Sequence, residues 1–469
     1  MFAKIQRIHF VGIGGIGMSG IAEVLINLGY RISGSDLKNS AITQRLAGLG
    51  ATIFEGHAAE NIAGAEVVVM SSAIVRENAE VTEAHRLHIP VIPRAEMLAE
   101  LMRLKYGIAI AGMHGKTTTT SMVAAVLAAG GLDPTVVVGG RVDAMGSNAR
   151  VGNSEYMVVE ADESDRSFLK LSPVLAVVTN VDREHMDCYR NMREVKRAFL
   201  EFMDRVPFYG AVVVCNDDPQ LRRLFPQIRR RTVSYGTRRG SDFHIKLGKA
   251  GFKSAVASEE RQPTSHFHVT FGERDLGEFR LHVPGVHNVM NATAAIAVGV
   301  GLDIEVDDIR AALENFRGVD RRFQLRGQAA GVSVIDDYGH HPTEIRATLA
   351  AARECGFRKI HVIFQPHRYT RTRDLTDEFA TSFENADSLV VLDIYAASET
   401  PIEGVTGESL ARLIGETGKS AASYAGSFAD GIASVVAAAQ PGDMILTLGA
   451  GSVSQLGPMI LEKLRAKGA

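Results

Sequence analysis

A glycine-rich segment that ends in a lysine and four threonines, AGMHGKTTTT from Ala111 to Thr120, carries the clearest chemistry in the sequence. Backbone N–H groups of such a loop hold phosphate oxygens at a helix N-terminus, the lysine neutralises the β and γ phosphates, and the next hydroxyl reaches Mg2+. Ile110 stands where the usual GxxxxGK[ST] motif begins with glycine, so this is a shortened GxxGKT loop. We expect it to bind ATP and Mg2+ through Gly112, Met113, His114, Gly115, Lys116, Thr117 and Thr118.

A second glycine-rich segment, GIGGIG from Gly12 to Gly17, follows a β-rich run near the N-terminus, and Ser35 and Asp36 stand about 20 residues further on. The GxGxxG pattern lets the backbone approach a diphosphate, and Asp36 can accept a hydrogen bond from a ribose hydroxyl. Taken alone, this pattern predicts NAD, although nothing in it requires nicotinamide. The structural alternative is that the glycines only allow tight packing of a strand against a helix.

Two further side chains fall just beyond predicted buried strands of the phosphate-loop region, Glu160 in VVEADESD and His185 in TNVDREHMD. A carboxylate and an imidazole at the same sheet edge as Thr117 are suited to share in holding Mg2+. Each residue taken singly is more often a surface or hydrogen-bonding residue, so the metal hypothesis rests on their shared location.

Two loops in the last third of the chain carry a third group of reactive side chains. DDYGHHPTEI contains Tyr338 and His340, and FQPHRYTRTRD contains Arg368 and Arg371. The forked donors of arginine suit a carboxylate or a phosphate, and with Tyr338 and His340 they would suit a small amino acid. A solvated basic loop is the alternative.

Short β-rich runs that alternate with helical patterns position all these segments, which predicts an α/β protein. The chain of 469 residues exceeds what one hydrophobic core usually supports. We expect three domains: a Rossmann-like domain over residues 1–104, a central P-loop ATPase-like domain with added antiparallel strands over 105–319, and a C-terminal Rossmann-like domain over 320–469.

Composition excludes several classes of function. Lys plus Arg (51) nearly balance Asp plus Glu (54), which does not indicate a nucleic-acid partner. Cys188, Cys215 and Cys355 show no paired spacing for disulfides or zinc. Apolar runs are shorter than the roughly 18 residues that a membrane span requires. We therefore expect a cytoplasmic protein with no membrane partner.

Together these motifs resemble the Mur ligase family, and the resemblance runs through all three expected domains. It rests on HFVGIGGIGMSGIAEVL, AGMHGKTTTT, VVEADESD, TNVDREHMD, GVHNVMNATAA, DDYGHHPTEI and FQPHRYTRT. The combination of GIGGIGMSG with the last two segments is most similar to the family member that adds L-alanine.

The resemblance implies the ligands of each domain, with a monomer or homodimer as the assembly. The UDP part of UDP-N-acetylmuramate would lie on Gly14, Gly15, Gly17, Ser35, Asp36, Ser71 and Ser72. ATP would also meet His287, Asn288, Asn291, Arg322 and Asp337. L-alanine would meet Tyr338, His340, Arg368 and Arg371.

The reaction implied by the resemblance makes an amide in two steps, in peptidoglycan precursor synthesis. The muramate carboxylate attacks the γ-phosphorus of ATP, and the amine of L-alanine attacks the resulting acyl phosphate. We hypothesise that His340 removes the amine proton, from its place in the GHHP loop. The catalytic residues would be Lys116, Glu160, His185, His340, Arg368 and Arg371.

One departure from the family pattern concerns a carbamylated lysine that several members carry 14 or 15 residues after the histidine matching His185. Phe199 and Leu200 occupy those positions, so this chain should not depend on that modification.

Three rival functions stay open. An NAD-dependent oxidoreductase would use Gly12 to Gly17 but leaves Lys116 and the arginine loop unused. A non-catalytic nucleotide-binding module would bind ATP without amino-acid-dependent phosphate release. The closest rival is a ligase that attaches a recycled peptide to the same muramate acceptor.

Replacing the phosphate-loop lysine tests the ATP hypothesis. Because one charge-stabilising donor commonly contributes about 3 to 4 kcal/mol to a transition state, Lys116→Ala should lower turnover on the order of a hundredfold or more. Steady-state phosphate release measures the effect, and near-normal turnover would refute the assignment.

Overall fold

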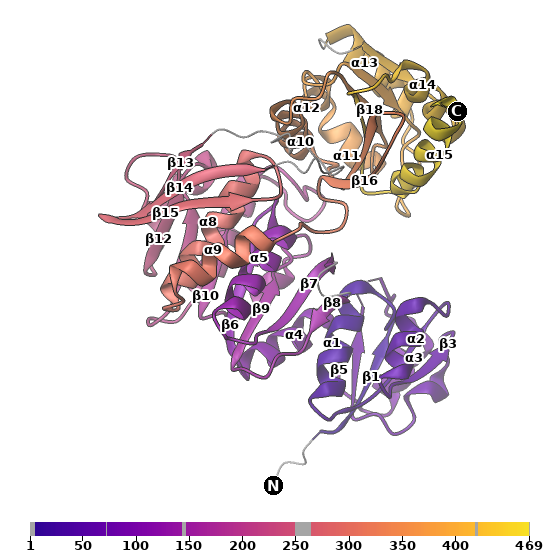
Figure 1. Ribbon diagram of the computed structural model, residues 1–469. Coiled ribbons are helices and arrows are strands. Elements are labelled where there is room, and N and C mark those ends of the chain that lie inside the picture. Colours follow the sequence, from indigo (N-terminus) through magenta and orange to yellow (C-terminus); the bar gives the residue numbers. More distant parts are fainter. Residues whose placement is uncertain (1–4, 72, 143–146, 249–263, 418–420, 469) are drawn as a thin grey trace. The chain divides into compact units, whose positions relative to one another are not determined.

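The computed structural model describes residues 5–71, 73–142, 147–248, 264–417 and 421–468. Their strands form three sheets of five, ten and six strands that follow one another along the chain (Figure 1). The chain forms two compact units, Met1–Lys246 with His268–Phe279 and Met290–Glu314, and Leu247–Phe267 with Arg280–Val289 and Asn315–Ala469. The predicted α/β fold is confirmed.

The N-terminal sheet is parallel throughout, with strand order β3-β2-β1-β4-β5. Its elements are β1 (Arg7–Val11), α1 (Ile16–Asn27), β2 (Arg31–Asp36), α2 (Ala41–Gly48), β3 (Thr52–Glu55), β4 (Val67–Met70), α3 (Ala79–Arg86), β5 (Val91–Pro93) and α4 (Arg94–Arg103). β1 is central, and the chain builds outward from it first on one side and then on the other. The strand order therefore reverses at β1, and parallel sheets commonly bind ligands beyond the carboxyl ends of the strands at such a point.

The central sheet has the order β15-β14-β13-β12-β11-β10-β6-β9-β7-β8. Its strands are β6 (Tyr106–Ala111), β7 (Thr135–Val142), β8 (Ser147–Arg150), β9 (Tyr156–Glu160), β10 (Leu175–Val178), β11 (Ala211–Cys215), β12 (Thr232–Gly236), β13 (Phe243–Leu247), β14 (Ser265–Phe271) and β15 (Arg274–Leu281). Its helices are α5 (Lys116–Ala129), α6 (Met192–Asp204), α7 (Pro219–Arg222), α8 (Val286–Gly301) and α9 (Val306–Asn315).

Strand direction in this sheet changes only toward its edges. The run from β12 to β7 is parallel. β13 joins β12 in parallel, whereas β8 pairs with β7 in the antiparallel direction. Two residues link the neighbouring strands β14 and β15, and such a short link allows only an antiparallel hairpin. The predicted antiparallel addition is therefore present in this hairpin.

The C-terminal sheet has the order β16-β17-β21-β18-β19-β20, and its inner strands β17, β21 and β18 are wholly buried. Its elements are β16 (Gln324–Ala329), β17 (Val332–Asp337), α10 (Pro342–Glu354), β18 (Ile360–Phe364), α11 (Tyr369–Asp374), α12 (Thr376–Ala380), β19 (Ser388–Val391), α13 (Gly407–Thr417), β20 (Ala421–Tyr424), α14 (Phe428–Ala438), β21 (Met444–Leu448) and α15 (Leu456–Gly468). In β18, Ile360, Val362 and Phe364 enter one apolar cluster while Ile363 enters another. This alternation leaves only the strand ends for polar chemistry.

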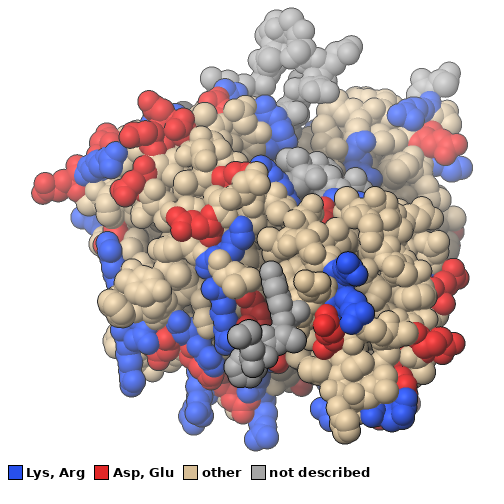
Figure 2. Space-filling view, turned by 90° about the horizontal axis from the view of Figure 1, so that it is seen from below, with Lys and Arg blue, Asp and Glu red and all other residues tan. Residues whose placement is uncertain are grey.

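Surface properties agree with the mixed composition. Lys and Arg side chains lie among Asp and Glu side chains over the face seen in Figure 2. Among the described residues, no helix combines the length and the hydropathy that a membrane crossing needs.

Phe199, one of the two positions at which the family resemblance would place a modified lysine, lies in the core of the central domain. Its ring lies 5.3 Å from that of Phe168, which in turn stacks 5.1 Å from Phe202, and all three side chains are fully buried. A lysine ammonium at this position would lie among phenyl rings.

Truncating Phe199 tests this packing. Phe199→Ala should lower the free energy of unfolding by about 3 to 5 kcal/mol, because a cavity replaces a buried ring. Urea denaturation measures the loss. Circular dichroism is a suitable probe because the chain contains no tryptophan. Arg197→Ala, on the exposed face of the same helix, should match the unchanged protein.

Candidate active site

The phosphate loop joins β6 to α5 at the carboxyl edge of the central sheet. Gly112 and Gly115 have φ values of +136° and +81°, which side-chain-bearing residues rarely adopt. A Cβ at Gly112 would collide with the Thr179 hydroxyl, and one at Gly115 would lie 2.7 Å from Asn291 Oδ1. The two glycines therefore allow both the turn and its close packing against neighbouring loops.

Lys116 folds back over its own loop. Its ammonium donates hydrogen bonds to the carbonyl oxygens of Gly112 (2.7 Å) and Met113 (3.1 Å) and to Glu163 Oε1 (2.8 Å). Burial by itself would lower the pKa of Lys116, but Glu163, Glu160 and Glu184 raise it above its usual value. The loop thus keeps a full positive charge where the phosphates are expected.

Glu163 is a member of this site that the sequence reasoning missed. Its side chain is 1% exposed, and Oε1 lies 3.4 Å from His185 Nε2 as well as beside Lys116. Oε2 is buried and has no hydrogen-bond partner among the described residues. The acid-rich run EADESD was the available signal, but only Glu160 was selected from it.

Glu160 and His185 reach the same region, as predicted from the strand ends. Glu160 is the last residue of β9 and pairs in register with Ile110 of β6, directly before the loop. Its charge contributes to the raised pKa of Lys116. His185 has a φ of +56°, a left-handed conformation that turns the chain after β10 toward Glu163. Their roles as metal ligands stay predictions.

The segment after β10 also holds the phosphate loop in shape. Asn180 Oδ1 accepts the His114 N–H and Asn180 Nδ2 donates to the His114 carbonyl, both at 2.9 Å. Thr179 Oγ1 donates to the same carbonyl at 2.7 Å, and His114 Nε2 lies 2.9 Å from Asp182 Oδ2. These contacts give a structural role to Thr179, Asn180 and Asp182 of the TNVDREHMD motif. The sequence analysis had assigned a role only to His185 of this motif.

The N-terminal glycine loop is closed by Asp36. The Asp36 Oδ2 atom accepts the Gly14 N–H at 2.8 Å, so the carboxylate lies directly over the loop. Ser71 lies beside Gly12, where an added Cβ would come within 3.2 Å of Ser71 Cβ. At Gly17 an added Cβ would lie 2.7 Å from Arg94 Nη1. Ser72 lies outside the described residues.

Ser35 differs from these rim residues because its hydroxyl is fully buried. It donates to Glu80 Oε2 at 2.6 Å, and His57 Nδ1 lies 2.9 Å from the same hydroxyl. Burial would raise the pKa of Glu80, but hydrogen bonds from His9, Ser35 and Asn61 lower it to about 2. In this structure Ser35 serves a buried network, and its expected contact with a nucleotide stays a prediction.

The C-terminal unit gathers two histidines in opposite tautomers. Arg371 Nη1 donates to His367 Nδ1 at 3.1 Å, which leaves the His367 proton on Nε2. His340 Nδ1 lies 3.1 Å from the Tyr338 carbonyl, which can only accept, so His340 carries its proton on Nδ1. The rings lie 5.7 Å apart, and His367 also stacks on Tyr395.

Burial, together with His340, Arg371, Arg368 and Arg321, lowers the pKa of His367 to about 3. His367 is therefore neutral at pH 7 and is a poor proton acceptor there. The role of His340 as the base for the amine stays a prediction.

The remaining predicted residues of this unit have mainly local contacts. Asp337 is buried and accepts the N–H groups of Phe323 and Gly339, both at 2.8 Å. The Arg322 guanidinium lies over the Tyr338 ring at 5.2 Å. Arg368 has a φ of +68° at the start of α11. On α8, Asn288 donates to the Pro284 carbonyl at 2.7 Å, whereas His287 is exposed.

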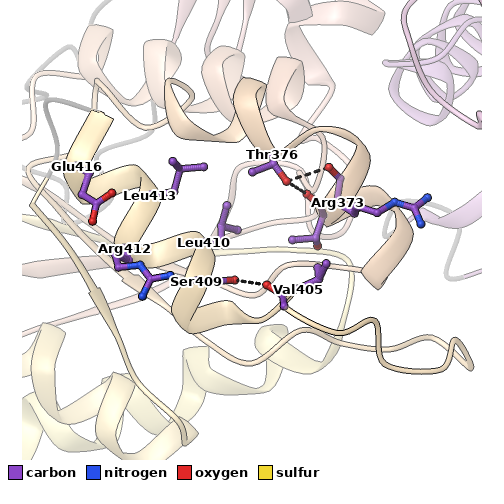
Figure 3. A pocket seen from close by; sticks show the side chains of 10 residues that line it. Arg373, Thr376, Val405, Ser409, Leu410, Arg412, Leu413 and Glu416 are labelled. Carbon is purple, nitrogen blue, oxygen red and sulfur yellow. Dashed lines mark hydrogen bonds between the residues drawn. The ribbon is translucent and has the colours of Figure 1, made fainter.

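A hollow of about 290 Å3 opens elsewhere in this unit, between α11, α12 and α13 (Figure 3). Thr376 closes one wall by donating to the carbonyl oxygens of Thr372 and Arg373, and Arg412 and Glu416 line the opposite side. It contains none of the predicted residues.

Comparison with known proteins assigns the class. The chain matches three models in succession: the Mur ligase family, catalytic domain, over residues 7–106; the Mur ligase middle domain over 110–299; and the Mur ligase, glutamate ligase domain over 321–451. The chain belongs to the Mur ligase family.

Individual relatives narrow the comparison. The UDP-N-acetylmuramate–L-alanine ligase of Koribacter versatilis (strain Ellin345) is 70% identical over 467 residues, covering 100% of this chain and 99% of the relative. The solved UDP-N-acetylmuramate-alanine ligase MurC from Thermotoga maritima is 30% identical with a TM-score of 0.79, covering 99% and 100%. A murein peptide ligase from Psychrobacter arcticus 273-4 is 24% identical with a TM-score of 0.66, covering 98% and 99%, which shows a shared fold.

Replacing Gly112 measures how tightly the loop is packed. Gly112→Ala should lower the free energy of unfolding by about 2 kcal/mol or more, through both its φ of +136° and the collision with Thr179. Gly131→Ala is the matched control, because Gly131 has a φ of +75° but no atom within 4 Å of an added Cβ. Equal losses in the two variants would contradict the steric account.

Acid should destabilise the C-terminal unit through His367. The unfolded imidazole takes up a proton below pH 6.5, whereas the folded one does so only near pH 3, so stability falls as pH drops through that window. In His367→Gln the urea midpoint should fall less between pH 7 and pH 5 than in the unchanged protein. The exposed His85→Gln variant should keep the original slope.

Proposed function

We propose that this ligase joins L-alanine to the carboxylate of UDP-N-acetylmuramate, giving UDP-N-acetylmuramoyl-L-alanine, ADP and phosphate. The observation that carries this proposal is the 70% identity, over the full length, to a relative named for that reaction. The charged phosphate loop around Lys116 supports the ATP-dependent half of it. The product belongs to peptidoglycan precursor synthesis.

Two displacements account for the reaction. A carboxylate oxygen of the muramate attacks the γ-phosphorus, the bond to the β-phosphate oxygen breaks, and ADP leaves. The amine nitrogen of L-alanine then attacks the acyl carbon, and phosphate leaves with the electrons of the C–O bond. The amine gives up a proton, for which we assign His340 Nε2, since Nδ1 already donates to Tyr338.

Charge stabilisation is the main task of the phosphate loop. Lys116 and the loop N–H groups would neutralise the phosphoryl oxygens, an effect that dominates phosphoryl transfer. Mg2+ would add positive charge there, and Thr117, Glu160 and His185 are assigned as its ligands. The buried, unpartnered Glu163 Oε2 supports a cation at this position, because oxygen is the ligand that Mg2+ prefers.

The other assignments follow the same proposal. Gly14, Gly15, Gly17, Asp36 and the neighbouring Ser35, Ser71 and Ser72 would serve the nucleotide sugar, and Tyr338, Arg368 and Arg371 the amino acid. The gap 300–320 between the second and third matched models contains the proposed boundary after residue 319, and the first model ends at residue 106, two residues beyond the proposed boundary after residue 104. We further propose that the protein is cytoplasmic and that it is a monomer or a homodimer.

The decisive assay supplies UDP-N-acetylmuramate, ATP and Mg2+ with either L-alanine or a tripeptide as acceptor amine. Phosphate release and mass spectrometry of the product should show turnover with L-alanine at least tenfold above that with tripeptide. Preference for the tripeptide would establish the peptide-adding rival instead. ATP binding without amine-dependent phosphate release would indicate a regulatory module.

A further inference from the structure

The ammonium of Lys116 already uses all of its hydrogen-bond donors within the protein. A protonated lysine offers three N–H donors, and Gly112, Met113 and Glu163 accept three hydrogen bonds from it. Lys116 can therefore reach a phosphate oxygen only by giving up one of these partners. Glu163 is one of the three and the only one of them that carries charge.

Glu163 also lies between two groups with separate tasks in the proposed reaction. Its Oε1 atom is 2.8 Å from Lys116 Nζ and 3.4 Å from His185 Nε2. The Tyr189 hydroxyl donates to the Glu163 carbonyl at 2.7 Å and so fixes the backbone of this residue. The Glu163 carboxylate therefore lies between the Lys116 ammonium, which is expected to bind phosphate, and the His185 imidazole, which we assign to the metal.

The second oxygen of Glu163 requires an explanation of its own. Oε2 is fully buried without a hydrogen-bond partner among the described residues. Burying an unpaired carboxylate oxygen is costly, and such atoms in native proteins generally meet a ligand or an ion. The excess of acid around one lysine, Glu160 and Glu184 besides Glu163, points to a cation rather than to an anion.

We propose that Glu163 is a positioning residue with one role for each oxygen. Oε1 holds Lys116 retracted while the loop is empty, and Oε2 is an oxygen ligand for the divalent cation that arrives with ATP. Lys116 then exchanges Glu163 for phosphate oxygens, and the carboxylate turns its charge to the metal. This proposal rests on the ATP and Mg2+ sites of the proposed function.

Opposite shifts in two binding constants test the proposal. In Glu163→Gln, Mn2+ should bind at least about tenfold more weakly, measured by electron paramagnetic resonance with a non-hydrolysable ATP analogue present. The analogue in EDTA should bind several-fold more tightly, measured calorimetrically, because a negative charge beside the phosphates and a competitor for Lys116 are both removed. A carboxylate that only supported the fold would weaken both.

Controls separate the possible failures. Glu155→Gln removes an exposed acid of the same domain and should change neither constant. Glu163→Asp keeps the charge on a shorter side chain and should retain more Mn2+ affinity than Glu163→Gln. Unchanged constants in Glu163→Gln, or weaker binding of both probes, would overturn the role of Glu163. Failure of the unchanged protein to bind the analogue with Mn2+ would instead overturn the proposed function.

Discussion

The buried ion pair of Lys116 and Glu163 is the interaction on which the nucleotide site depends. An ammonium held away from water tends to lose its proton, and only nearby carboxylates keep it charged. Here Glu163 touches the ammonium, and Glu160 and Glu184 add their charges from further away. The loop can therefore present a permanent cation to a triphosphate.

Parallel strand register brings these groups together. β6, β9 and β10 lie side by side, so the residues that follow them meet at one edge of the sheet. Glu160 ends β9 opposite Ile110, and Thr179 follows β10 next to the loop. Gly112 must lack a side chain because Thr179 stands where its Cβ would be. The same few residues around the phosphate loop must therefore satisfy both steric and electrostatic constraints.

The sequence was informative where a motif is short and local. Both glycine loops, the strand-and-helix alternation and the hairpin near residue 272 were predictable from spacing and turn chemistry. Short edge strands such as β3 and β8 were not, because their few residues carry no clear periodicity. Glu160 and His185 lie near the phosphate loop, where the ends of β9 and β10 place them, and their roles have still to be tested.

Partners distant in sequence account for what was missed. Glu163 stands 47 residues from Lys116, and nothing in EADESD shows which of its acids turns inward. Ser35 has the position of a nucleotide contact in the GxGxxG pattern, yet its hydroxyl is drawn into the core by Glu80, 45 residues away. Burial is the main cause of the lowered pKa of His367, followed by the charges of His340 and Arg371, and such burial cannot be read from the letters of FQPHRYTRTRD.

The packing of the C-terminal sheet affects which amino-acid substitutions this protein can tolerate. Its inner strands contribute buried side chains to two apolar clusters, one around Val362 and one around Ile363. Tyr338 and His340 lie in the loop after β17 and Arg371 lies on α11, and none of the three is a member of either cluster. Under the proposed function these three residues meet the amine, so substitutions that alter amine selectivity can accumulate without loss of the fold, and the fold can be strengthened without changing that selectivity.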